Sequence, residues 1–128
     1  MELKKRIAAV TASLAAFAST ALVLAPDASA VSWNGCNYPQ VCFYQNIIRW
    51  NAGNPDARYQ DITSGYQNLS TAARGANYVY NTRNDDVAWL RYIEYGETKY
   101  TCLSPNSMES FDAVETLTGI KISSASHC

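Results

Sequence analysis

The stretch Cys36-Asn37-Tyr38-Pro39-Gln40-Val41-Cys42-Phe43-Tyr44 is a turn closed by two cysteines that runs straight into an apolar, strand-like segment. Pro39 presets a bend, and the two cysteines are close enough in the sequence to form a disulfide. Val41, Phe43 and Tyr44 are residue types that fit a half-buried pleated surface. The stretch therefore predicts the first strand of the folded domain.

Downstream of this strand, short runs of β-branched and aromatic residues alternate with turn-forming residues. Loops are predicted at 50–56 and 104–107, and the pattern at 111–117 is ambiguous. Short strands with turns about every ten residues, and no convincing amphipathic helix, predict an all-β sandwich. The further runs predicted as strands are Arg58–Ile62, Tyr66–Leu69, Asn77–Asn81, Val87–Glu94, Thr98–Leu103 and Gly119–Ser123.

Upstream of the cysteine turn, Met1–Ala30 has the layout of a secretory signal. A basic end at Lys4-Lys5-Arg6 precedes an apolar stretch, Ile7–Leu24, and small residues follow at Ala28-Ser29-Ala30. This order is typical of a cleaved signal peptide, and no other segment is apolar for long enough to cross a bilayer. We expect residues 1–30 to be removed and residues 31–128 to form one soluble, extracellular domain.

All four cysteines, Cys36, Cys42, Cys102 and Cys128, lie in the part expected to be exported. An even count in an oxidising compartment favours two disulfides over metal binding or a catalytic thiol. Three pairings are possible, and the short local pair Cys36–Cys42, which leaves Cys102 with Cys128, is the favoured one. In the chain-entropy description these two loops contribute about 2 and about 3.5 kcal/mol to stability.

Charge gives no indication of a polyanionic partner. From Val31 onward the chain carries seven Lys or Arg and nine Asp or Glu residues, with no run of one sign. Neither a nucleic-acid footprint nor a polybasic membrane patch is therefore supported. We expect a monomer that binds neither nucleic acid nor membranes.

The sequence contains no recognised catalytic motif. Its only histidine, His127, lies beside the terminal cysteine, and there is no His-Glu-x-x-His, Gly-x-Ser-x-Gly or phosphate-binding glycine loop. The carboxylate pairs Glu94/Glu97 and Asp85/Asp86 are typical of solvated surface on a small β-protein. We therefore predict that the protein is not an enzyme.

The sequence resembles the secreted bacterial inhibitors of peptidase inhibitor family I36. The features that carry the resemblance are Cys-x5-Cys-Phe-Tyr at 36–44, Asn68-Leu69, and Asn84-Asp85-Asp86-Val87 leading into the Trp89 strand. The likeness covers nearly all of residues 31–128 and implies a βγ-crystallin-like Greek-key sandwich. It also implies inhibition of thermolysin-like zinc metalloproteinases through a stiff, substrate-like loop, so that the expected partner is an extracellular protease.

The resemblance places the reactive-site loop at Cys102, Leu103, Ser104 and Pro105, with the Cys102–Leu103 peptide bond offered to the protease. Leu103 would then fill the apolar protease pocket, contributing about 1.5 to 3 kcal/mol, and the Cys102 carbonyl would face the zinc. The family pattern closes this loop with a second cysteine where this sequence has Ser107, and Pro105 offsets part of that loss by limiting the loop's freedom. The alternative is that Cys102 is a plain crosslink and Leu103 a strand-end residue.

The βγ-crystallin resemblance also raises a Ca²⁺ site. Asn84, Asp85 and Asp86 match the acidic half of the motif by which many such domains bind calcium, but Ala88 stands where a hydroxyl ligand belongs. The alternative is a solvated turn whose aspartates cap backbone amides. A secreted structural or Ca²⁺-binding module without inhibitory activity is therefore the second functional hypothesis, and no other cofactor is expected.

Overall fold

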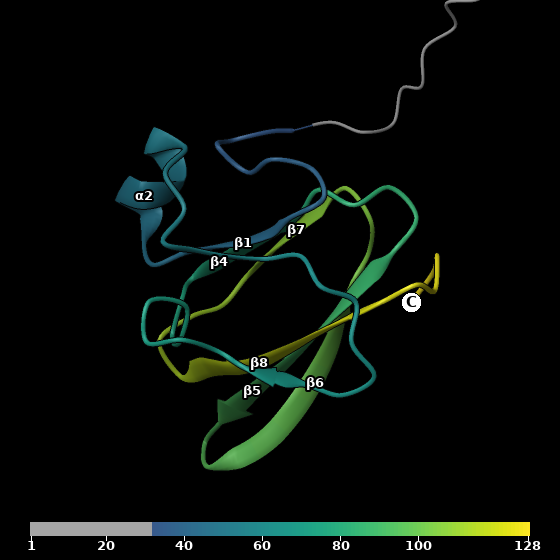
Figure 1. The fold of residues 1–128 in the computed structure, drawn as a ribbon. Helices are drawn as coiled ribbons and strands as arrows, with labels where there is room; N and C mark the ends of the chain where they lie inside the picture. The colour runs from purple at the N-terminus through teal and green to yellow at the C-terminus, as the bar shows by residue number, and fades with distance from the viewer. Residues whose placement is uncertain (1–31) are drawn as a thin grey trace, which may run out of the picture.

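The structure, a computed structural model, describes residues 32–128, so the predicted secretory signal at 1–30 lies outside the described residues. Two four-stranded antiparallel sheets face one another (Figure 1), with strand orders β2-β1-β4-β7 and β3-β8-β5-β6. The elements are β1 (Val41–Tyr44), α2 (Ile47–Ala52), β2 (Ala57–Tyr59), β3 (Gln67–Asn68), β4 (Tyr78–Asn81), β5 (Val87–Glu94), β6 (Glu97–Leu103), β7 (Ser107–Ser110) and β8 (Glu115–Ser123). The prediction of an all-β protein is confirmed.

The two sheets exchange one strand each. Strands β1, β2 and β4 share the first sheet, whereas β3 crosses to the second sheet and pairs with β8, bringing Gln67 opposite Ile120. In the second half of the chain, β5, β6 and β8 share a sheet while β7 crosses to pair with β4, bringing Tyr80 opposite Met108. Each half of the chain therefore completes the sheet of the other half.

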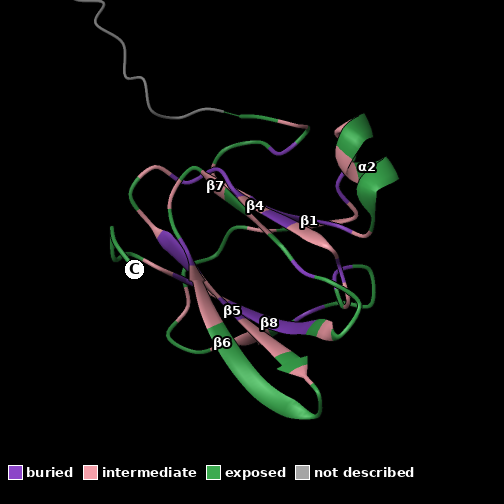
Figure 2. Cartoon of the chain, turned by 180° about the vertical axis from the view of Figure 1, so that it is seen from behind, coloured by how far each residue is buried: buried purple, intermediate pink, exposed green. Residues whose placement is uncertain are grey.

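The main core lies between the inner faces of the two sheets (Figure 2). Strand β4 alternates, so that Val79 points into this core while Tyr78 and Tyr80 lie on the outer face. On β5, Ala88 and Leu90 point inward. The largest fully buried side chains of this core are Phe43, Leu90, Leu117, Ile120, Ile122, Val41 and Val79.

A second, smaller core lies on the outer face of the first sheet. Cys36, Cys42 and Tyr44 are fully buried there, and Trp50, Tyr78 and Tyr80 pack against them. Strand β1 is consequently buried on both faces, which explains why its four residues are all apolar or aromatic instead of alternating with polar ones. The prediction that this stretch forms the first strand is confirmed.

The helix α2 corrects the prediction that the segment after β1 contains no helix. Its Asn46 cap accepts a hydrogen bond at Oδ1 from the Arg49 amide, 3.0 Å away, and Gly53 ends it in a left-handed conformation at φ 65°. Both residues are ordinary helix-boundary signals. No residue of the helix is fully buried, so the apolar periodicity that would have indicated it is missing.

Strand β7 is the other element that the sequence did not predict. Its residues, Ser-Met-Glu-Ser, lie at an edge of the first sheet and none is fully buried. An edge strand forms backbone hydrogen bonds to one neighbour without needing a buried face, so its sequence shows no strong strand pattern. The last strand, β8, also begins earlier than predicted, at Glu115.

Both favoured disulfides are present. Cys36 is bonded to Cys42 across six residues and Cys102 to Cys128 across 26, with Cα atoms 5.8 and 5.7 Å apart. The first bond closes the turn before β1, and the second attaches the C-terminal tail to β6. Among residues 32–128, no helix is long and apolar enough to cross a membrane.

Candidate functional site

The predicted reactive-site leucine lies inside the molecule. Leu103 is the last residue of β6, pairs with Ala88 on β5, and is 2% exposed in the main core. Its side chain would have to leave the core to enter a partner's pocket. The role assigned to Leu103 as the anchor therefore does not fit this arrangement, in which Leu103 is a strand-end core residue.

Hydrogen bonds fix the loop that follows. The buried Asn81 amide donates to the carbonyl oxygens of Leu103 and Ser104, at 3.3 and 3.2 Å, and to that of Asp86 at 3.0 Å. Ser107, the position where the family pattern has its second cysteine, donates from its hydroxyl to the Ser104 carbonyl. A hydrogen bond thus closes this loop in place of the family's second cysteine, and sequence reasoning did not identify Asn81 as the loop's support.

The accessible part of the predicted site is the outer edge of β6, which is the last strand of its sheet. Tyr95 and Gly96, at φ 50° and 79°, form the two-residue turn that joins β5 to β6. In such a hairpin the closing pair, here Glu94 and Glu97, is a hydrogen-bonded pair, and hydrogen-bonded positions recur every second residue. The backbone N–H and C=O groups of Thr98, Tyr100 and Cys102 therefore point away from β5, toward the free edge.

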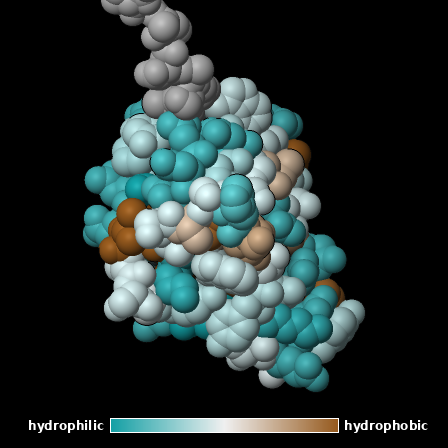
Figure 3. Space-filling view, turned by 90° about the vertical axis from the view of Figure 1, so that its right-hand side faces the viewer, coloured by the Kyte–Doolittle hydropathy of each residue, from teal (hydrophilic) through white to brown (hydrophobic). Residues whose placement is uncertain are grey.

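Side chains on this edge are largely exposed. Residues 97–100 are all exposed, and Tyr100, at 55% exposed, rests against Tyr66 with ring centroids 5.3 Å apart. Lys99 pairs with Glu94 at 2.7 Å, and this hydrogen bond raises the Lys99 pKa. The side of the molecule shown in Figure 3 is mostly hydrophilic, with apolar side chains in small separate groups. Binding at β6 would therefore depend on backbone groups more than on a hydrophobic patch.

The predicted Ca²⁺ turn is organised around an ion pair. The Arg83 side chain, 8% exposed, donates from Nε to Asp86 Oδ2 at 2.7 Å and from Nη1 to the carbonyl oxygens of Pro39 and Gln60. Asp86 thus neutralises a buried cation, while Asp85 is exposed. In the part of the chain that the structure describes, no group of three or more acidic, His or Cys side chains is placed to hold a metal ion.

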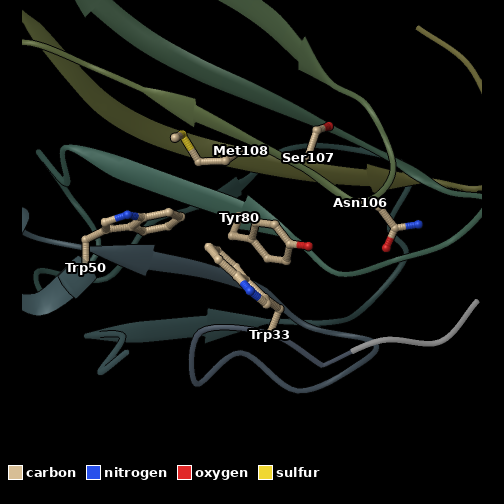
Figure 4. A pocket seen from close by; sticks show the side chains of 6 residues that line it. All are labelled: Trp33, Trp50, Tyr80, Asn106, Ser107 and Met108. Carbon is tan, nitrogen blue, oxygen red and sulfur yellow. The ribbon is translucent and has the colours of Figure 1, made fainter. Parts of the chain in front are cut away.

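A groove on the outer face of the first sheet was not anticipated from the sequence. This aromatic groove encloses about 340 Å³ and is lined by Trp33, Trp50, Tyr80, Asn106, Ser107 and Met108 (Figure 4). Its walls come from the N-terminal segment, α2, β4 and the start of β7, which are far apart in the sequence. Trp33 is 49% exposed and Met108 45%.

The tryptophans of the groove are held by the surrounding structure. Trp33 exchanges two backbone hydrogen bonds with Cys36, at 3.0 and 2.9 Å, and Cys36 is held by its disulfide. Ring centroids lie 5.4 Å apart between Trp33 and Trp50, and 5.0 Å apart between Trp33 and Tyr80. Burial raises the pKa of the Tyr80 hydroxyl, which is therefore neutral at physiological pH. The sequence showed the aromatic residues but not that a helix and a crossing strand bring them together.

The resemblance to peptidase inhibitor family I36 has no independent support from known proteins. Comparisons with protein-family models, with curated proteins and with solved structures found no match to this chain.

Proposed function

We propose that this protein is a secreted inhibitor of extracellular, thermolysin-like zinc metalloproteinases, carried on a βγ-crystallin-like Greek-key sandwich. The observation that carries the proposal is the free, exposed edge of β6 beside the Cys102–Cys128 disulfide. The exchange of β3 and β7 between the sheets favours the Greek-key assignment. The two disulfides and the signal-like residues 1–30 favour export to an oxidising compartment.

Proteases bind their substrates as extended strands, and an exposed sheet edge offers the same backbone groups. Thr98, Tyr100 and Cys102 would pair with the edge of the protease cleft, as an added strand does in other peptide complexes. The Cys102 carbonyl, at the end of this row, would face the catalytic zinc, which acts as a Lewis acid. Tyr100 replaces the buried Leu103 as the exposed side chain available to the protease.

Stiffness would make such a strand an inhibitor instead of a substrate. Strand β6 is paired with β5 along all seven of its residues, Cys102 is bonded to Cys128, and Asn81 holds the carbonyl of Leu103. A cleaved strand held at these points would not separate, so the cut bond would re-form more readily than the product would leave. Because the bound geometry is already present, little conformational entropy is lost on binding.

Titration of thermolysin with purified residues 31–128 tests the proposal. We expect inhibition at micromolar concentration or below. Tyr100→Pro removes the backbone N–H directed to the free edge and should weaken inhibition about tenfold or more, the equivalent of one or two hydrogen bonds. Tyr100→Ala keeps that N–H and measures the side chain alone, and Ile48→Ala, on the exposed helix, should inhibit like the parent protein.

Two results would contradict the proposal. One is the absence of inhibition by the folded protein at micromolar concentration against a panel of zinc metalloproteinases. The other is full inhibition by a Tyr100→Pro variant whose circular dichroism shows the parent fold. A substitution such as Leu103→Asp would not test the proposal, because a carboxylate at a 2%-exposed core position would destabilise the fold.

A further inference from the structure

The aromatic groove lies away from the β6 edge and has a chemistry of its own. The six residues that line it carry no charge. One end, at Trp50 and Met108, is apolar. At the other end the Tyr80 hydroxyl points toward the Asn106 side chain (Figure 4).

The polar end has unused hydrogen-bonding capacity. Neither the Tyr80 hydroxyl nor the Asn106 side-chain amide has a hydrogen-bond partner among residues 32–128, whereas the Ser107 hydroxyl already donates to Ser104. The Asn106 backbone is fixed by its N–H, which donates to the Arg83 carbonyl at 3.0 Å. An amide that both donates and accepts, next to a phenol, can therefore bind a ligand that carries hydroxyl groups.

These features select a class of ligand. A charged ligand would find no opposite charge in the groove, and a wholly apolar ligand would gain no hydrogen bond from the exposed Asn106 amide or from the partly exposed Tyr80 hydroxyl. A pyranose ring matches both ends because its C–H face can lie on the negative face of an indole while its hydroxyls reach the polar groups. The volume, about 340 Å³, is at the lower end of the range of about 300–1,000 Å³ for ligand sites and suits about one such ring.

We propose that the aromatic groove binds a neutral pyranose unit, with Trp33 as the stacking platform and Asn106 and Tyr80 as the hydrogen-bonding groups. Trp33 is 49% exposed, so part of its indole is open to a ligand, and the Cys36–Cys42 bond holds the segment that carries it. The groove is open to solvent, so the unit can be a free sugar or one residue of a longer polysaccharide.

Binding is measured on residues 31–128 by co-sedimentation with insoluble cellulose and chitin, and by tryptophan fluorescence with cellohexaose, chitohexaose, methyl β-glucoside and N-acetylglucosamine. We expect at least one of the polysaccharides or hexasaccharides to bind and to change the fluorescence. Full competition by a monosaccharide identifies a single-unit ligand, and binding of the hexasaccharides alone identifies a chain. Either result supports the proposal.

Variants locate the binding. Trp33→Ala should weaken it at least tenfold, and Asn106→Asp, which keeps the side-chain shape but removes the N–H donors, should weaken it several-fold. Tyr95→Ala removes an aromatic side chain that is 80% exposed at the β5–β6 turn and should leave sugar binding unchanged. Thermal unfolding of each variant separates lost binding from lost folding.

The proposal is overturned if none of these carbohydrates binds at millimolar concentration, or if a folded Trp33→Ala variant binds like the parent. It is also overturned if sedimentation shows a dimer that Trp33→Ala dissociates, since the groove would then receive a second copy of the chain. Protease inhibition does not enter any of these measurements, so the sugar site and the inhibitor function stand or fail separately.

Discussion

The outer faces of the two sheets are built differently. The outer face of the first sheet is covered, because the segment before β1 and helix α2 lie over it and bury Cys36, Cys42 and Tyr44 completely. The outer face of the second sheet is open. It carries Arg91 and Lys121, both partly exposed, whose cationic groups lie over the Tyr66 ring, 5.5 and 5.2 Å from its centroid.

This difference explains where the two candidate sites lie. On the first sheet this cover, formed by the segment before β1 and by helix α2, is incomplete. The aromatic groove is the space between the two tryptophans of the cover and the exposed part of the sheet. On the second sheet β6 is the edge strand, and no strand formed by residues 32–128 pairs with its other side, so its exposed part, residues 97–100, is left accessible. The segment that covers the first sheet is fixed by backbone hydrogen bonds and a disulfide, whereas the outer face of the second sheet carries contacts between partly exposed side chains.

The largest effect on stability is expected from Gly35→Ala, which disturbs the contact between the segment before β1 and the end of helix α2. Gly35 has φ 75°, and a Cβ there would lie 1.9 Å from the carbonyl oxygen of Gly53 at the end of α2. Because backbone cannot move aside as a side chain can, we expect a loss of about 3 kcal/mol or more in the free energy of unfolding. Gly65→Ala, where nothing lies within 4 Å, should be near neutral. Denaturant unfolding measures both, and a Gly35→Ala cost below about 1 kcal/mol would show that the cover is not rigid.

A second effect concerns Tyr44, which is buried under the same cover and donates its hydroxyl proton to the Asn34 carbonyl at 2.6 Å. Burial raises the pKa of Tyr44 to about 12, while the positive charge of Arg58 opposes the shift. Since the unfolded tyrosine ionises near pH 10, its contribution is complete below pH 10 and is lost as the pH rises toward 12.

We therefore expect the parent protein to lose about 2 to 3 kcal/mol more than Tyr44→Phe between pH 9 and pH 12. Denaturant unfolding of both proteins across this range measures the difference, which cancels the contributions of all other groups. Parallel pH profiles for the two proteins would mean that the cover admits water to this hydroxyl.

The covered face was only partly predictable from the sequence. The cysteine turn and the uniformly apolar β1 predicted a strand, and the local disulfide followed from the spacing of Cys36 and Cys42. The helix that completes the cover was missed because it has no buried face, although Asn46 and Gly53 are ordinary boundary signals. Its importance comes from Trp50, whose ring partners Trp33 and Tyr78 are distant in the sequence.

At the candidate inhibitory site, the position of the strand was predictable but the direction of its side chains was not. Thr98–Leu103 was recognised as a strand, and the partner of Cys102 followed once the local disulfide was assigned. Whether Leu103 faces solvent or the core depends on the pairing register with β5, where it lies opposite Ala88. A shift of one residue would exchange the two faces, and nothing in β6 alone fixes that register.

The smallest effect is expected from Gly119→Ala on the open face. A Cβ at Gly119 would lie 2.7 Å from the guanidinium carbon of Arg91, whose Nη2 donates to Asn68 Oδ1 at 2.7 Å and to the Thr118 carbonyl at 3.1 Å. The guanidinium can swing away into solvent, so the cost should be about 1 kcal/mol, the value of the weakened hydrogen bonds. Denaturant unfolding measures this cost.

Repeating Gly119→Ala in an Arg91→Ala background completes a double-mutant cycle. With the guanidinium absent, alanine should be neutral or slightly stabilising, because glycine in a strand interior is the less favourable residue. A cost that persisted without Arg91 would place the constraint in the backbone of β8. The open face would then be as rigid as the covered one, and the contrast between the two sheets would not hold.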